Sequence, residues 1–204
     1  MRIVVKASEE QKAEWIEKVA SNAAVEFISA DESLFEITAD VYFILTTEKD
    51  LNEIASIQQP VFVNAVAETL NELPGNCMRI NAWNGFLKRD IAEIVAAEKN
   101  KSIAAAVMNH LNWKYIFVPD VRGMITARVI CMIINEAYFA LGDKVSTKDE
   151  IDTAMKLGTN YPYGPFEWSK KIGLKNIYHL LQALSKEDHR YIAAPLLEEE
   201  VANM

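Results

Sequence analysis

The stretch Asp149–Trp168, DEIDTAMKLGTNYPYGPFEW, decides the fold of the second half of this chain. A Thr147-x-x-Glu150 pattern overlaps its start and is typical of a capping box, in which a hydroxyl and a carboxylate bond the free amides of a helix start. Gly158 is placed to adopt the left-handed conformation that ends a helix, and Pro165 suits the first position of a second helix. The stretch therefore predicts a helix, a rigid Pro/Gly elbow and another helix.

The segments on either side of this stretch are also helical in pattern. Residues Met124–Leu141 are apolar nearly all round, which predicts a helix buried against a sheet, a neighbouring helix or a partner subunit. Beyond the elbow, apolar residues recur at helical spacing from Ile177 to Leu184. Residues 121–204 are therefore expected to form an all-helical domain, with a boundary near residues 120–123.

Residues 1–120 show a different pattern, in which short β-branched or aromatic runs alternate with helical stretches. This alternation is typical of βαβ units and predicts a small α/β domain with a mainly parallel sheet. The expected strands span residues 2–6, 25–28, 41–45, 61–63, 78–83, 91–96 and 115–118, and the expected helices span 8–21, 48–57 and 101–111.

Composition and charge exclude several functional classes. Of 204 residues, 50% are hydrophobic and 25% charged, as in ordinary globular proteins. The net charge is −8, and residues 1–78 hold five basic against fourteen acidic side chains, which argues against nucleic acid. Without an apolar run of span length or a signal peptide, a cytoplasmic protein without a membrane partner is expected. Two distant cysteines and three scattered histidines predict neither a disulfide nor a metal site.

The elbow stretch also carries a motif. Its helix is written D-x-A-M-K-x-G, from Asp152 to Gly158, and its turn P-x-G-P-F-E, from Pro162 to Glu167. At these ten positions it resembles the C-terminal domain of the 3-hydroxyacyl-CoA dehydrogenases. The resemblance implies a Rossmann-like domain followed by an all-helical domain of the 6-phosphogluconate dehydrogenase C-terminal type. It also implies a homodimer formed through the helical domain and a role in fatty-acid metabolism.

The family's nucleotide-binding turn is replaced in this chain. These dehydrogenases open with a strand and a G-x-G-x-x-G turn, because glycine lets the backbone approach a pyrophosphate at a helix N-terminus. Here the first strand is followed by Lys6–Gln11, KASEEQ, and the first glycine is Gly75. Glu9 and Glu10 suit the helix dipole but compete with an anionic ligand. The sequence therefore predicts that no NAD or other cofactor binds at this turn.

The family's catalytic segment, similar to H-F-F-N-P followed by a strand with a glutamate, is altered too. It corresponds to Asn81–Gly85, where Asn84 matches the motif's asparagine, and to Glu93, which falls at the position of the family's histidine-orienting glutamate. The histidine position is Asn81, and an amide cannot take a proton from a hydroxyl at neutral pH. The resemblance thus places Glu93 and Asn81 at the catalytic positions, without the general base.

Two further segments complete the comparison with the family. An S-N-T-S-S-like segment corresponds to Val63–Ala67, which contains no hydroxyl, and P-G-F-x-x-N-R corresponds to Arg122–Arg128. There Gly123 and Arg128 match, while Ala127 replaces the active-site asparagine. Asn84 and Arg128 are therefore the candidates for substrate binding.

Each of these candidates also has a structural interpretation. Glu93 can be a solvated or ion-paired strand residue, and Asn81 and Asn84 can bond turn amides. Arg128 can serve packing or a subunit contact.

Three functions are compatible with the sequence. The first is a 3-hydroxyacyl-CoA dehydrogenase-like protein that has lost NAD binding and dehydrogenase activity but keeps the fold and the dimer. The second is an active NAD-dependent oxidoreductase with an atypical site, in which Glu93 is the base. The third is an acyl-CoA-binding or regulatory module with its pocket between the two halves of the chain.

Overall fold

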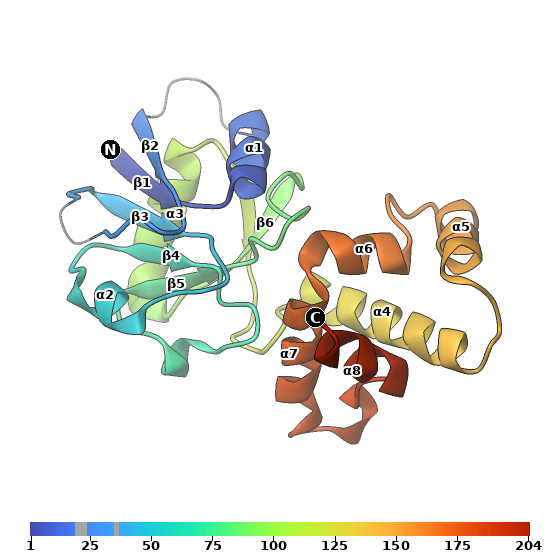
Figure 1. Cartoon of the computed structure of the whole chain (residues 1–204). Coiled ribbons are helices and arrows are strands. Elements are labelled where there is room, and N and C mark those ends of the chain that lie inside the picture. The colour runs from blue at the N-terminus through green and yellow to red at the C-terminus, as the bar shows by residue number, and fades with distance from the viewer. Residues whose placement is uncertain (19–23, 35–36) are drawn as a thin grey trace. The chain divides into compact units, whose positions relative to one another are not determined.

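The computed structural model describes residues 1–18, 24–34 and 37–204. The chain divides into two compact units, a sheet unit at Met1–Met124 and a helical unit at Ile125–Met204 (Figure 1). The last three residues of the helix predicted at 8–21 lie outside the described residues. None of the helices in the described ranges is both long and apolar enough to cross a membrane.

The sheet unit is built on seven strands in the order β2-β1-β3-β4-β5-β6-β7. All neighbouring strands pair in parallel except β5 and β6, so β6 and β7 run opposite to the first five strands. The predicted mainly parallel sheet is therefore confirmed. The strands are β1 Arg2–Lys6, β2 Ala24–Ile28, β3 Val41–Ile44, β4 Val61–Val63, β5 Cys77–Ile80, β6 Ile91–Val95 and β7 Lys114–Phe117.

Helices cover both faces of this sheet. On one face, α1 (Glu9–Lys18) and α3 (Lys101–His110) pack against the strands, and on the other α2 (Leu51–Ser56) contributes Ile54. Trp15 of α1 lies 4.8 Å from Phe43 and 4.5 Å from Trp113, centroid to centroid, in tilted and edge-on arrangements. Such aromatic pairs add about 0.5–1.5 kcal/mol each beyond the burial of their surface. Short 3₁₀ turns lie at Leu70–Glu72 and Glu98–Asn100.

The helical unit contains five α-helices and one 3₁₀ turn within its described residues. The predicted apolar stripe from Ile177 to Leu184 is buried at its core. The elements are α4 Thr126–Gly142, α5 Lys148–Thr159, α6 Pro165–Ile172, α7 Leu174–Ser185, η3 His189–Tyr191 and α8 Pro195–Ala202. This arrangement of a mostly parallel sheet unit and a helical unit is the fold class that the sequence predicts.

The elbow motif holds α5 and α6 together. The buried carboxylate of Asp152 accepts the backbone N–H of Phe166 at 2.8 Å and of Glu167 at 3.1 Å, so a side chain of α5 caps the start of α6. Lys156 forms an ion pair with Glu167. A Cβ on Gly164 would lie 2.3 Å from Asp152 Oδ1, which explains the glycine. The motif residues are therefore joined to one another by a long-range helix cap.

Two predicted helix ends differ from the structure. Gly158 lies inside α5, and the left-handed position belongs to Asn160, with φ 56°. Asparagine tolerates this conformation better than most residues, so the helix continues through Thr159, whose hydroxyl donates to the Met155 carbonyl at 2.6 Å. At the start of α4, Met124 has φ 49°, and the helix begins two residues later than predicted, at Thr126.

Candidate functional site

The carboxyl ends of β1 to β5 lie at one edge of the sheet, which we call the carboxyl edge. The strand order reverses beside β1, which lies between β2 and β3. In open α/β sheets, ligands bind outside the carboxyl ends of the strands at such a reversal. The segments that follow four of these strands form the edge: Ala7-Ser8, Leu45-Thr46, Asn64-Ala65 and Asn81-Ala82.

The start of α1 at the carboxyl edge is closed by its own side chains. The Ser8 hydroxyl accepts the backbone N–H of Gln11 at 3.3 Å, and the Ser8 N–H donates to Gln11 Oε1 at 3.0 Å. This reciprocal pair is a capping box. The Gln11 side chain, 4% exposed, also donates to the carbonyls of Leu45 at 2.5 Å and Ala82 at 2.8 Å. Gln11 thus links the start of α1 to the chain after β3 and after β5.

Asn64 completes this buried amide network. Its side chain is 2% exposed, and its Nδ2 donates to the Leu45 carbonyl at 2.8 Å. Its Oδ1 accepts the Ala82 N–H at 3.1 Å. Since a buried polar group without a partner costs about 1–3 kcal/mol, these bonds hold the loops of the carboxyl edge in one arrangement.

The predicted catalytic positions, Asn81 and Glu93, lie opposite each other. The Asn81 N–H donates to the Glu93 carbonyl at 3.4 Å, one step beyond the antiparallel pair Ile80–Ile94. Each side chain is 5% exposed, so Glu93 is not the solvated strand residue that the sequence also allowed. Arg89 lies 4.0 Å from the Glu93 carboxylate. Asn81 Nδ2 is buried and has no hydrogen-bond partner among the described residues.

The loop with Asn84 is bound to α1 through two carboxylates. The Asn84 side-chain amide donates to Glu10, and the Gly85 N–H donates to Glu14 Oε1 at 2.6 Å. Gly85 has φ 93°, a conformation that favours glycine at this turn. The amide that the sequence proposed for substrate binding is therefore already hydrogen-bonded to the first turn of α1.

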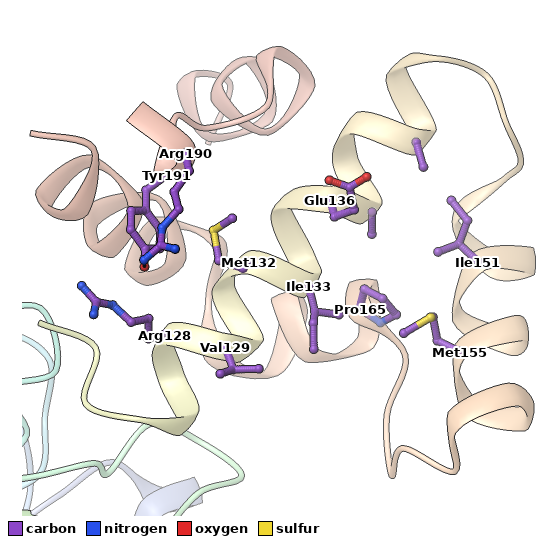
Figure 2. Close-up of a pocket in the computed structure, with 12 residues that line it drawn as sticks. Arg128, Val129, Met132, Ile133, Glu136, Ile151, Met155, Pro165, Arg190 and Tyr191 are labelled. Atoms are coloured by element: carbon purple, nitrogen blue, oxygen red, sulfur yellow. Dashed lines mark hydrogen bonds between the residues drawn. The ribbon is translucent and has the colours of Figure 1, made fainter. Parts of the chain in front are cut away.

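Arg128, the other predicted substrate-binding residue, belongs to the helical unit. It lies in the first turn of α4, and its guanidinium carbon is 5.2 Å from the centroid of the Tyr191 ring. Its Nε is buried without a hydrogen-bond partner in the described parts of the chain. Figure 2 shows Arg128 at one end of a groove that runs along α4.

This groove, which we call the α4 groove, has a volume of about 640 Å³. Its walls are mostly apolar side chains of α4 and α5, with Arg190 and Tyr191 of η3 near the Arg128 end (Figure 2). The lining residues are Arg128, Val129, Met132, Ile133, Glu136, Ala137, Ala140, Ile151, Met155, Pro165, Arg190 and Tyr191.

The polar network of Gln11, Asn64 and Glu14 was not predicted from the sequence. A signal was available, because Asn64 and Asn81 each come directly after a buried strand, and such positions meet at the carboxyl edge. Gln11 gave no such signal, since a polar residue in a first helical turn is ordinary. In the described ranges no group of three His, Cys, Asp or Glu residues is placed to hold a metal.

Comparison with known proteins agrees with the resemblance seen in the elbow motif. Residues 123–203 match the family model of the 3-hydroxyacyl-CoA dehydrogenase C-terminal domain. The 3-hydroxyadipyl-CoA dehydrogenase of Escherichia coli K12 is 29% identical over 170 residues, covering 80% of this chain and 36% of that protein. The 3-hydroxybutyryl-CoA dehydrogenase of Clostridioides difficile is 27% identical over 203 residues, covering 93% of this chain and 72% of that protein. The chain thus spans about a third of the length of the first relative.

Solved structures share the fold. The (S)-3-hydroxybutyryl-CoA dehydrogenase of Ralstonia eutropha aligns with a TM-score of 0.75 at 17% identity, covering 99% of this chain and 93% of that one. The 3-hydroxybutyryl-CoA dehydrogenase of Escherichia coli K12 is 30% identical with a TM-score of 0.55, and the alignment covers 79% of this chain and 31% of that one. Its helical-domain match, these relatives and its fold therefore show a 3-hydroxyacyl-CoA dehydrogenase-like protein, whose residues 123–203 match the C-terminal domain of that family.

Proposed function

We propose that this 3-hydroxyacyl-CoA dehydrogenase-like protein neither binds NAD nor transfers hydride, and that it keeps the family's fold and a homodimer. The observation that carries the proposal is the amide network of Gln11 and Asn64, which occupies the carboxyl edge beside α1 with intramolecular hydrogen bonds. In this proposal residues 1–120 are a degenerate Rossmann-like domain and residues 121–204 the helical domain.

The residues at the start of α1 do not fit a dinucleotide. A pyrophosphate needs main-chain amides at a helix N-terminus and a backbone without side chains in its way. Here the Ser8 hydroxyl takes the Gln11 N–H, and Glu9 and Glu10 bring negative charge to the first turn. The Glu10 carboxylate is bound to the Asn84 amide, so a phosphate would meet an anion that is held in place.

The opposed pair Asn81 and Glu93 supports the loss of dehydrogenase chemistry. Oxidation of a hydroxyl by hydride transfer needs a base to accept the hydroxyl proton, and an amide has no basic site near neutral pH. Glu93 is buried on the neighbouring strand, and by the resemblance it corresponds to the residue that orients the base. Without an imidazole between it and the substrate, the pair holds no general base of the family type.

The homodimer is proposed through the helical unit. Its support is the α4 groove, an apolar surface on a helix that the sequence predicts to be buried against a sheet, a neighbouring helix or a partner subunit. Large exposed apolar patches on soluble domains commonly mark interaction sites.

Titration calorimetry with NADH tests the loss of cofactor binding. We expect no heat of binding up to millimolar NADH, with the Clostridioides difficile relative, assayed in parallel, as the reference. Micromolar binding would overturn the proposal. Turnover of 3-hydroxybutyryl-CoA that is abolished by Glu93→Gln would instead establish the alternative, an active NAD-dependent dehydrogenase with an atypical site.

A second candidate function, acyl-CoA binding, is favoured by one observation. Asn81 Nδ2 is a buried donor without a partner among the described residues, and it can donate to a thioester carbonyl. A ligand at 100 times its dissociation constant adds about 2.7 kcal/mol of stability. A thermal shift series with acyl-CoA esters, compared between the wild type and Asn81→Leu, tests it. A shift that Asn81→Leu removes supports this function, and a flat series excludes it.

A further inference from the structure

Another pocket lies in the sheet unit, at the end of α1. Its volume is about 420 Å³, and its lining side chains are polar or charged, unlike those of the α4 groove. Four of them are basic and two are acidic, so this pocket is positive in a chain whose net charge is −8. We call it the Lys18 pocket, and it is lined by Glu17, Lys18, Lys88, Arg89, Asp90, Asn112 and Lys114.

Lys18 is the half-buried amine of this pocket. Its Nζ donates to the Arg89 carbonyl and lies 4.8 Å from the centroid of the Trp113 ring. Trp113 is itself buried and belongs to the aromatic cluster around Trp15. The amine is therefore held in place between the last turn of α1 and the segments that precede β6 and β7.

This environment makes Lys18 a reactive amine near neutral pH. Burial lowers its pKa from 10.5 to about 8, while Asp90 opposes this shift and Arg89 assists it. At pH 8 about half of such an amine is the free base, against about 0.3% of an amine with a pKa of 10.5. Only the free base has a lone pair that can attack a carbonyl carbon, and a lowered pKa is one way in which lysines become nucleophiles. The neutral amine still has N–H groups, so it keeps its bond to the Arg89 carbonyl.

The other basic residues indicate which reagent this amine can meet. Lys88, Arg89 and Lys114 line the same pocket, and ammonium and guanidinium groups both bind phosphate oxygens. In an acyl phosphate, the phosphate is bonded directly to the reactive carbonyl group. Cations that hold the phosphate therefore bring the carbonyl carbon close to the amine of the pocket. Glu17 and Asp90 weaken this attraction, but four basic residues against two acidic ones leave the pocket positive.

We propose that Lys18 is an acylation site, whose amine takes the acyl group of a small acyl phosphate bound by Lys88, Arg89 and Lys114. The amine nitrogen forms a bond to the acyl carbon, the bond from this carbon to the bridging oxygen breaks, and phosphate leaves with one proton of the amine. The products are an amide at Lys18 and inorganic phosphate, and no atom is oxidised or reduced. The site belongs to the sheet unit alone and does not depend on the loss of NAD binding or on the homodimer.

Acetyl phosphate tests the site in the full-length protein. Peptide mass spectrometry after short incubations at pH 8 measures the acetylation rate of each lysine. We expect Lys18 to react at least about tenfold faster than Lys175, an exposed lysine of α7, because far more of its amine is the free base. The rate at Lys18 should level off above about pH 9, where its amine is almost fully deprotonated. A rate at Lys18 no greater than that at Lys175 would overturn the proposal.

A neutral donor separates the reactivity of the amine from the role of the cations. Lys114→Gln removes one positive charge from the Lys18 pocket, and the matched control Lys175→Gln removes one from α7. We expect Lys114→Gln to slow acetylation of Lys18 by acetyl phosphate at least about threefold, but to leave its reaction with neutral p-nitrophenyl acetate within about 1.5-fold. Lys175→Gln should change neither rate, and circular dichroism verifies that both variants fold. An unchanged rate of Lys114→Gln with acetyl phosphate, or an equal loss with both donors, would overturn the proposal.

Discussion

The backbone N–H of Asn81 donates to the carbonyl of Glu93 at 3.4 Å, which makes the two residues direct neighbours across β5 and β6. Directly opposite residues of an antiparallel pair place their side chains on the same face, with Cβ atoms about 5 Å apart. Asn81 and Glu93 therefore form a close pair of one amide and one carboxylate, and a side chain introduced at residue 81 would lie beside the carboxylate.

This geometry makes Asn81→His a direct test of the site. We expect the Glu93 carboxylate to raise the pKa of the introduced imidazole above its ordinary value of about 6.5. A group whose pKa is raised by folding stabilises the protein below its unfolded pKa, and this contribution is lost as pH rises through the folded pKa. An NMR titration measures the value. The same substitution in a Glu93→Gln background is the control, and an identical pKa in both backgrounds would show that Glu93 does not act on this position.

We expect Gln11→Ala to destabilise the sheet unit much more than the substitution of an exposed polar residue would. It leaves the buried carbonyls of Leu45 and Ala82 without this donor and removes one half of the capping box, and we expect a loss of about 2–4 kcal/mol. Urea unfolding measures the loss. The exposed Gln59→Ala is the matched control, with an expected change within about 0.5 kcal/mol. Equal effects of the two substitutions would contradict a structural role for the network.

Two glycines of the elbow should respond in opposite directions to alanine. At Gly164 the new Cβ would lie 2.3 Å from Asp152 Oδ1, so the cap of α6 must move, and we expect a loss of about 2 kcal/mol or more. At Gly158, inside α5, a Cβ meets no atom within 4 Å, and we expect a gain of about 0.5–1 kcal/mol. Thermal unfolding of both variants, compared with the wild type, measures the two changes in stability. A stabilising Gly164→Ala would disprove the packing described for Asp152.

Lys18 should make stability depend on pH in the alkaline range. Burial, together with the neighbouring Arg89, lowers the pKa of this amine from 10.5 to about 8, although Asp90 acts in the opposite direction. Between about pH 8 and 10.5 the native state releases this proton while the unfolded chain keeps it, so the stability from this group rises with pH. We expect the free energy of unfolding of the wild type relative to Lys18→Met to increase from pH 7 to pH 10. A difference that stays constant would contradict the lowered pKa.

Much of the fold could be predicted from the sequence because its signals are local. The capping box of Thr147 and Glu150, the proline at the start of α6 and the apolar stripe of α7 each act over one or two helical turns. The alternation of strands and helices indicated a mainly parallel sheet for the same reason, since a βαβ unit is built from neighbouring segments. The motif of the elbow indicated the family from ten residues.

Tertiary structure alone decided the rest, because the deciding contacts join residues far apart in the chain. The bond from Gln11 to Ala82 spans 71 residues, and only the folded sheet shows that this side chain fills the place beside the helix start. The reversed direction of β6, which sets Asn81 opposite Glu93, leaves no trace in its five residues, IAEIV. By itself the sequence determined which elements form, and it indicated the polar positions at which the chain departs from the family's motifs. Packing determined that α4 presents Arg128, Met132 and Glu136 along one open groove, since a helix that is apolar nearly all round does not specify which side its own chain leaves uncovered.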